Sequence, residues 1–121
     1  MLEEGVSAED IDKTMLEFGM PMGPLQLLEE IGLDVAYKAS KILEQSFGER
    51  FRAARGIKEI KKYRSCRACS AKTSQHILER LLHPMRREAG LCLEEGLAAS
   101  REVIDLALLL GIGFPPPKRI W

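Results

Sequence analysis

Asparagine is absent from this 121-residue sequence, and cysteine, histidine and aromatic residues are scarce. Three cysteines do not make a paired disulfide framework, which favours a reducing, cytoplasmic environment. No run of about 18–20 apolar residues occurs, so no membrane span is predicted. The acidic start, MLEEG, has no apolar segment of the kind that a secretion signal needs. No stretch alternates apolar and polar residues as a half-buried strand does, and the sequence therefore predicts an all-α fold.

Charge is balanced overall but unevenly placed. The chain has 18 basic and 18 acidic residues, and the segment from Arg50 to Lys72 holds nine Lys and Arg against one acid, Glu59. The interpretation that we favour for such a segment is a solvated linker. An anionic partner is the alternative. Nucleic acid is not expected, because Tyr63 offers little stacking surface and no nucleic-acid-binding motif accompanies the segment.

The first 48 residues predict three helices. Ser7 is a good N-cap for a helix that Gly19 ends. Pro24 suits the first turn of a second helix, which ends at Gly32, and a third runs from about residue 34 to 47 before Gly48. Each has an apolar stripe at helical spacing. The stripes are Ile11, Met15 and Phe18, then Leu25, Leu28 and Ile31, then Val35, Ala39, Ile42 and Leu43.

The second half predicts two more helices after a basic connector, residues 49–74, that is partly helical at most. From Gln75 the apolar residues fit one helix face across about five turns, with a kink expected at Pro84 and an end at Gly96. Ser100 is expected to cap a last helix, residues 101–110. That helix is apolar almost all round and is therefore predicted to be buried.

The order of features at the start of the chain recurs near its end. LEEG occurs at 2–5 and at 93–96, and each copy precedes a capped helix with an Ile-Asp pair and then a Gly-x-Pro turn. Such an ordered set indicates a duplicated unit. We therefore expect two helical units, residues 1–48 and 75–121, packed face to face as a pseudo-dimer.

The first unit lacks the long leading helix of the second. Ile11, Met15 and Leu28 are therefore expected to be short of cover, and the chain is expected to form a homo-oligomer.

Two stretches resemble one known family. They are EEGVSAEDIDKTMLEFGMPMGPLQLLEEIGLDVA, residues 3–36, and RLLHPMRREAGLCLEEGLAASREVIDLALLLGIGFPP, residues 80–116, together about 70 of the 121 residues. They resemble the C-terminal helical domain of the 3-hydroxyacyl-CoA dehydrogenase family, above all in the multifunctional enzymes of fatty-acid β-oxidation, where this domain occurs twice in tandem. The resemblance implies a helical fold like the C-terminal domain of 6-phosphogluconate dehydrogenase.

The resemblance implies a parent reaction in which NAD accepts a hydride from a 3-hydroxyacyl-CoA. In the family, a dinucleotide-binding half holds NAD and supplies a His–Glu pair as the general base, and an Asn on the leading helix assists. This chain has no strand followed by G-x-G-x-x-G, and Glu79 stands at the Asn position of the one matching motif, ERLLHP. We therefore expect no catalytic and no cofactor-binding residue here. The acyl-CoA is expected to bind together with a dinucleotide-binding domain that this chain lacks.

The resemblance also implies substrate contact at the turn GMPMGP, through Met20, Pro21, Met22, Gly23 and Pro24. Methionine suits the wall of an acyl pocket, although it suits an ordinary helix–helix core equally well. The second turn, GIGFPPP, is followed by KRIW where relatives continue with Arg-Gly-Gly. We therefore expect this second turn to serve packing between the two units.

Other candidate sites are weaker. Cys66 and Cys69 form a C-x-x-C with His76 and His83 downstream, but this spacing fits no common zinc pattern. Free thiols and no metal site are expected. A lone His such as His83 is more often structural than catalytic, and no nucleophile or carboxylate stands at a spacing that would serve it.

A further hypothesis places the CoA phosphates against Lys61, Lys62 and Arg64 of the basic connector. In relatives this connector usually carries a Gly-Lys-Gly-Phe-Tyr-like turn, whereas here only KKYRSC stands near that point.

Overall fold

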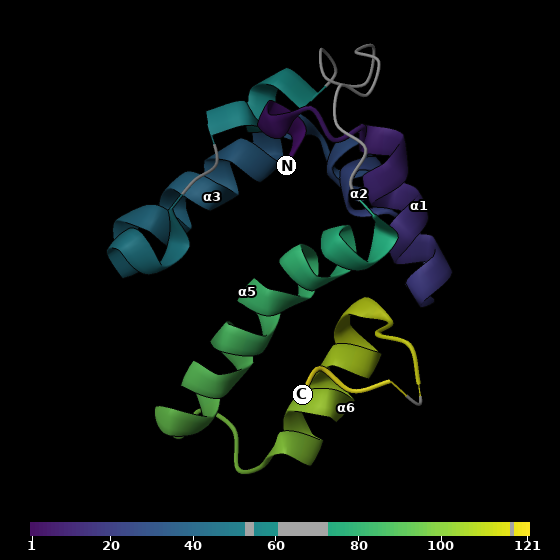
Figure 1. The fold of residues 1–121 in the computed structure, drawn as a ribbon. Helices are drawn as coiled ribbons and strands as arrows, with labels where there is room; N and C mark the ends of the chain where they lie inside the picture. Colours follow the sequence, from purple (N-terminus) through teal and green to yellow (C-terminus); the bar gives the residue numbers. More distant parts are fainter. Residues whose placement is uncertain (53–54, 61–72, 117) are drawn as a thin grey trace.

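The computed structural model describes residues 1–52, 55–60, 73–116 and 118–121 (Figure 1). The elements are η1 (Leu2–Glu4), α1 (Ala8–Phe18), α2 (Pro24–Ile31), α3 (Leu33–Phe47), η2 (Gly48–Phe51), η3 (Arg55–Glu59), α5 (Ser74–Glu94) and α6 (Arg101–Ile112), where η marks a 3₁₀ helix. These residues contain helices and no strand, so the all-α prediction is confirmed. Within the same residues, no helix is both long and apolar enough to span a membrane.

Helix α5 joins the two ends of the molecule (Figure 1). Its first turns lie beside α1 and the group of short helices around it, and its later turns lead to α6 and the C-terminal segment. The buried residues form two clusters. The first cluster is Val6, Ala8, Ile11, Leu25, Ile60 and Ile77, and the second is Leu82, Ala89, Ile104, Phe114 and Ile120. Because Ile77 and Leu82 are both on α5, this helix contributes to both cores.

Local sequence signals set the helix ends as predicted. The Ser7 hydroxyl accepts a hydrogen bond of 3.0 Å from the Asp10 N–H at the start of α1. Gly19 ends that helix in the left-handed conformation, with φ of 111°, which glycine adopts at little steric cost. Pro24 is the first residue of α2, and Gly48 follows the last residue of α3.

Ser100 stands at the N-cap position of α6, as predicted, but its side chain makes no capping hydrogen bond with the backbone of the first helical turn. The Ser100 hydroxyl instead hydrogen-bonds the Glu102 carboxylate, and this bond is the main reason why the pKa of Glu102 lies below its ordinary value. The hydroxyl therefore acts as a donor to a side chain in place of its usual role as a cap acceptor.

The predicted burial of the last helix is wrong. Ile104 is the one residue of α6 that is buried, whereas Leu106 is 54% exposed and Leu110 is 77% exposed. Apolar composition predicted burial, but one side of α6 packs on the second cluster and the other sides face outward. The exposed apolar residues of α6 are Val103, Leu106, Leu109, Leu110 and Ile112.

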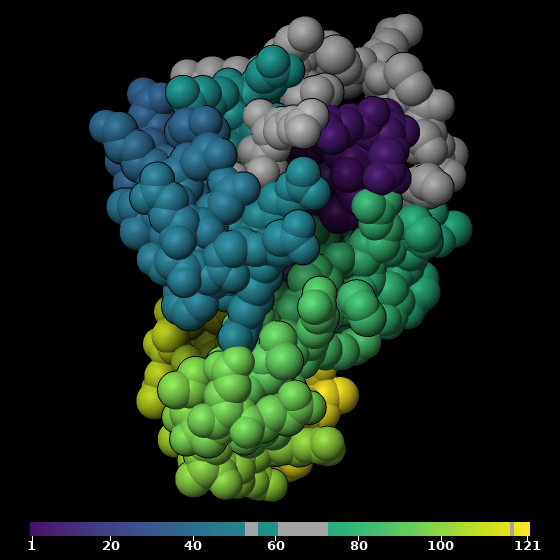
Figure 2. All heavy atoms as spheres, turned by 90° about the vertical axis from the view of Figure 1, so that its left-hand side faces the viewer, coloured from purple at the N-terminus to yellow at the C-terminus, as the bar shows by residue number. Residues whose placement is uncertain are grey.

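The burial of apolar residues among the first 48 residues also differs from the prediction. Ile11 and Met15 are buried, at 3% and 5% exposure, so the expectation that they lack cover is wrong. The cover for Ile11 comes from later in the chain, because Ile60 and Ile77 lie in the same cluster. The apolar stripe of α3, in contrast, stays exposed to solvent. Ile42, for example, is 62% exposed. Figure 2 shows the face of the molecule on which α3 forms the surface.

The two Gly-x-Pro turns contact each other reciprocally. A Cβ on Gly19 would lie 2.9 Å from Pro115 Cβ, and a Cβ on Gly113 would lie 3.1 Å from Pro21 Cγ. The glycine of each turn thus makes room for the proline of the other. Gly113 and Pro115 of the second turn therefore pack against Pro21 and Gly19 of the first, in line with the packing role expected of the second turn. The aromatic rings of Phe18 and Phe114 extend this contact, edge to face, with centroids 5.6 Å apart.

This contact predicts opposite effects for two glycines of the same helix end. Gly113→Ala should destabilise the protein by about 1–2 kcal/mol, because Gly113 has φ of 67° and a methyl group would press on Pro21. Gly111→Ala should stabilise by about 0.5–1 kcal/mol, because Gly111 lies within α6 with open space around it. Urea unfolding followed by circular dichroism measures both, and equal effects would contradict the assignment.

Candidate functional site

Asp12 joins α1 to the start of α2. Its side chain is on the buried face of α1, with the residue only 8% exposed. One carboxylate oxygen accepts from the Leu25 N–H at 2.7 Å, and the other accepts from the Gln26 N–H at 3.2 Å. The first N–H groups of a helix have no partner inside the helix and favour negative charge. Asp12 therefore caps α2 from a neighbouring helix, which the residue before α2 cannot do itself, because Gly23 has no side chain.

The Gly-Pro pair of the turn fits this carboxylate. A Cβ on Gly23 would lie 2.5 Å from the Cβ, Cγ and Oδ1 atoms of Asp12, so any larger residue there would displace the carboxylate. Pro24 stands at the first helical position, where its missing N–H costs nothing and its fixed φ suits the helix. The sequence requirement at GMPMGP is thus set in part by Asp12, eleven residues before Gly23.

The structure does not bring the five predicted contact residues to one place. Met20 packs against the second buried cluster, and Pro21 lies against Gly113. Gly23 is buried against Asp12. The other two of the five residues are placed differently: Met22 is half-buried and belongs to neither cluster, and Pro24 lines a cavity.

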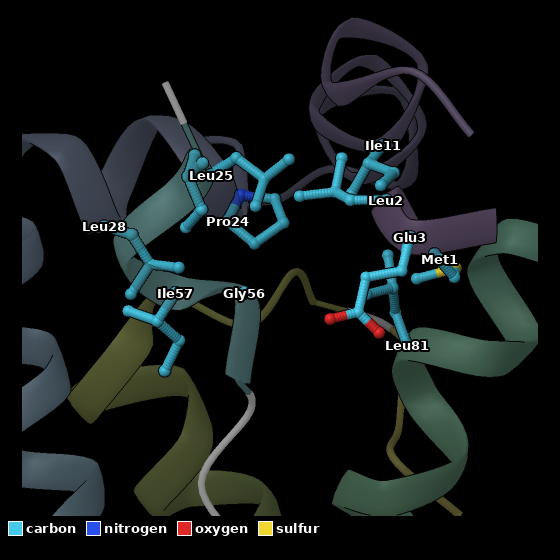
Figure 3. A pocket seen from close by; sticks show the side chains of 11 residues that line it. Met1, Leu2, Glu3, Ile11, Pro24, Leu25, Leu28, Gly56, Ile57 and Leu81 are labelled. Atoms are coloured by element: carbon cyan, nitrogen blue, oxygen red, sulfur yellow. The ribbon is translucent and has the colours of Figure 1, made fainter. Parts of the chain in front are cut away.

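The cavity beside Pro24 has a volume of about 430 Å³ (Figure 3). Its walls come from η1, α1, the first turns of α2, residues 56–60 and α5. Among the lining residues Glu3 is the one with a charged side chain, and the others are apolar residues or glycine. In Figure 3, Leu28 and Ile57 point inward from one side, opposite Leu81 and Glu3. A volume of this size lies within the range of small-molecule sites, about 300–1,000 Å³.

Arg50, the first residue of the basic segment, is engaged inside the molecule. Its guanidinium donates to both carboxylate oxygens of Glu88 and to Glu95, which are on the later turns of α5. These two carboxylates hold the pKa of Arg50 well above its ordinary value, with the hydrogen bond to Glu88 as the largest cause. The guanidinium also lies about 6 Å from the ring centroids of Phe47 and Phe51. Arg50 therefore fastens the end of α3 to α5, and it is not free for an anionic partner.

The remaining candidates form no centre in the part of the chain that the structure describes. Glu79, at the position of the family's Asn, pairs with Arg86 at 3.0 Å. His76 and His83 are exposed on α5. No group of three or more His, Cys, Asp or Glu residues there is placed to hold a metal ion. The C-x-x-C cysteines, Tyr63 and the three basic residues proposed for the CoA phosphates lie outside the described residues.

Sequence reasoning missed the role of Asp12. The signal was available, because Asp12 is an acid directly after Ile11 on a helix whose apolar stripe continues at Met15. An acid on the buried face of a helix needs a hydrogen-bonding partner. The sequence did not show that this partner is the start of the next helix.

The described residues do not fit a dinucleotide cofactor. A dinucleotide site needs a strand, a glycine-rich turn and a helix whose N-terminus faces the pyrophosphate. Here the N-terminus of α2 already faces the Asp12 carboxylate, and a Gly-Pro pair precedes it in place of a glycine-rich turn. No step of a hydride transfer is therefore assigned to these residues.

Comparison with known proteins matches this helical region to one family. The 3-hydroxyacyl-CoA dehydrogenase C-terminal domain family matches residues 1–75. The fatty acid oxidation complex subunit alpha of Shewanella sp. (strain W3-18-1) and that of Shewanella baltica (strain OS185) are each 35% identical over 147 aligned positions. Each alignment covers 96% of this chain and 21% of the relative. The chain thus spans about a fifth of the length of these relatives.

The aligned region is longer in the relatives than in this chain. Since 147 aligned positions exceed the 121 residues present, at least 26 of those positions belong to the relatives alone. This chain therefore holds a shortened form of the matched region.

The capping role of Asp12 predicts a loss of stability on Asp12→Asn. The amide keeps one acceptor but places an NH₂ group against a backbone N–H, so the free energy of unfolding should fall by about 1–3 kcal/mol. Asp105 is the matched control, because it follows Ile104 as Asp12 follows Ile11. Within the described residues, its buried Oδ1 has no hydrogen-bond partner and its Oδ2 is 4.0 Å from Arg119.

Asp105→Asn should change the stability by less than about 0.5 kcal/mol. Urea unfolding of both variants checks the pair. A loss at Asp105 as large as that at Asp12 would show that the cap is not the cause.

Proposed function

We propose, because the chain belongs to the family of 3-hydroxyacyl-CoA dehydrogenase C-terminal domains, that it serves as a substrate-binding and dimerisation-type domain of an NAD-dependent 3-hydroxyacyl-CoA dehydrogenase in fatty-acid oxidation. By itself it is not catalytic in this proposal. The observation that carries the proposal is the end of the turn GMPMGP: Pro24 lines an apolar cavity, and the N–H groups of the two residues after it are held by Asp12.

The acyl-CoA contact is proposed at the same turn, Met20–Pro24, with unequal roles for its residues. Met22 and Pro24 are the two side chains that contact the ligand, because neither belongs to a buried cluster. Met20, Pro21 and Gly23 fix the shape of the turn through their packing. NAD binds the dinucleotide-binding part of the whole enzyme, and the helical chain closes over the acyl-CoA from the other side.

The two halves of the chain are proposed to descend from one duplicated unit, residues 1–48 and 75–121, with the basic connector 49–74 between them. The reciprocal contacts of Gly19 with Pro115 and of Gly113 with Pro21 support this proposal. Two copies related by a twofold axis contact each other in this way, each offering the same surface to the other.

A homo-oligomer is also part of this proposal. The residues that support it differ from those from which the sequence analysis expected association. The exposed apolar residues of α3 and α6, such as Ile42 and Leu110, support it, since exposed apolar side chains favour association. Light scattering measures the state directly. A monomer at high protein concentration would remove this part of the proposal.

Titration of the chain with dodecanoyl-CoA tests the main proposal. We expect binding by isothermal titration calorimetry, and no NADH production when 3-hydroxydodecanoyl-CoA and NAD are supplied. Met22→Asp should weaken binding by at least about tenfold, because a carboxylate at this position meets an apolar and anionic ligand. Leu16→Asp, at a 46% exposed position of α1, is the matched control and should leave binding unchanged.

Three results would overturn the proposal. They are NADH production by the chain alone, equal loss in the two variants, or tighter binding of a single-stranded oligonucleotide than of dodecanoyl-CoA. The last would favour an independent module that uses the basic segment 50–72.

A further inference from the structure

The last four described residues, 118–121, form a C-terminal strap that contacts three helices. At its end, Ile120 is fully buried in the second cluster, and its carbonyl accepts a hydrogen bond of 2.7 Å from Arg86 Nε on α5. Trp121 packs against the same cluster, and the Arg101 guanidinium of α6 lies 4.8 Å from its ring centroid. In Figure 1 the C-terminus lies beside α6. The end of the strap is therefore anchored to α5 and α6.

The start of the strap is bound to the end of α1. The Lys118 ammonium group donates to the Phe18 carbonyl and lies 4.1 Å from the centroid of the Phe18 ring. Phe18 is the last residue of α1, and the last carbonyls of a helix have no partner inside the helix and favour positive charge. The Lys118 N–H donates at 2.9 Å to the carbonyl of Pro115, the proline that lies against Gly19. Lys118 therefore closes the end of α1 at the point where the turn GMPMGP begins.

The two ends of the turn GMPMGP are held by different parts of the molecule. At the first end, the Met20 N–H donates to the Met15 carbonyl at 3.0 Å, and the Met20 side chain packs against the cluster that contains Ile120. At the second end, Asp12 binds the N–H groups of the two residues after Pro24. The strap therefore acts on the first end of the turn, and Asp12 acts on the second.

We propose that the C-terminal strap positions the turn GMPMGP and that Lys118 is the positioning residue through which it acts. Met22 lies between the two held ends and belongs to neither cluster, so its place depends on both ends. Loss of the Lys118 contact loosens the first end and leaves the end at Asp12 in place. The role of the strap rests on these contacts alone, whereas its effect on acyl-CoA affinity rests on the proposed function.

Amide hydrogen exchange, followed residue by residue by NMR, tests the strap without any ligand. Lys118→Met removes the ammonium group and keeps most of the side chain, so the Gly19 and Met20 amides should exchange about three- to tenfold faster. The Leu25 and Gln26 amides, at the second end of the turn, should keep their rates. Lys118→Arg retains the donor and the charge and should restore the original rates.

Lys13→Met is the matched control. Lys13 is on the same helix as Phe18, its side chain is 71% exposed, and its ion pair of 3.8 Å with Glu17 is separate from the strap. The control should change the exchange rates of the turn by less than about twofold. Equal acceleration at both ends of the turn by Lys118→Met would show that Lys118 only stabilises the whole fold. Unchanged rates at the first end would show that it does not hold the turn. Either result would overturn the proposal.

Titration calorimetry with octanoyl-CoA and with its neutral analogue octanoyl-N-acetylcysteamine relates the strap to binding. Lys118→Met should weaken the binding of both thioesters about three- to tenfold, because a loosened turn must be ordered when the ligand binds. Lys118→Arg should restore the affinity, and Lys13→Met should leave it unchanged. Weakening for octanoyl-CoA alone would show that Lys118 attracts the phosphates directly, which would overturn its positioning role.

The strap and the proposed function can fail separately. If neither thioester binds the unaltered chain, the proposed function fails, and the exchange rates still decide on the strap. If both bind and Lys118→Met changes neither the affinities nor the exchange rates, the strap is overturned and the proposed function stands. Faster exchange at the first end with unchanged affinity would support the strap and count against the turn as the acyl-CoA contact.

Discussion

The hydrogen bonds from the start of α2 to the Asp12 carboxylate are the contact on which the arrangement of α1, α2 and the turn between them depends. They fix the angle between α1 and α2, because one side chain must reach two successive N–H groups, those of Leu25 and Gln26. They also set the residue before α2, since only a glycine leaves room for the carboxylate. Because Leu25 and Ile11 both line the cavity, this one contact determines how far apart two of its walls lie.

A second constraint relates the ends of the chain. The turn after α1 and the turn after α6 are about a hundred residues apart in sequence, yet each inserts a proline against the glycine of the other. Lys118 strengthens the same contact, because its ammonium group donates to the Phe18 carbonyl and lies 4.1 Å from the Phe18 ring centroid. The position of α1 is therefore fixed from two sides, by α2 through Asp12 and by the C-terminal turn.

Local features of the fold could be predicted from the sequence, and the partners of each helix face could not. Ser7, Gly19 and Pro24 act within one helical turn, so their roles follow from residue type and order. The burial of α6 depends on which elements pack around it, and the periodicity of its own sequence does not show this. In the same way, Ile11 lost its predicted exposure because Ile60 and Ile77 cover it from segments much later in the chain.

The same distinction between local features and packing partners holds for the candidate site. The resemblance marked the turn Met20–Pro24, but not how its residues separate between core, turn and cavity. The wall residues 56–60 come from the basic connector, which has few large apolar residues and was expected to be a solvated linker. Ile60 is 2% exposed, so that expectation fails at this point. A single isoleucine in a charged stretch has no periodic pattern by which to recognise its burial.

The difference between the two turns follows from their prolines. In the first, the residues after Pro24 have N–H groups that meet Asp12. In the second, the residues that follow Phe114 are three prolines, which have no N–H to donate. Asp105 occupies the position of Asp12 in the repeated pattern, but its buried Oδ1 finds no donor among the described residues. Asp105 thus lacks the donors that Asp12 has, so the second turn can pack against the first but cannot start a capped helix beside a cavity as the first does.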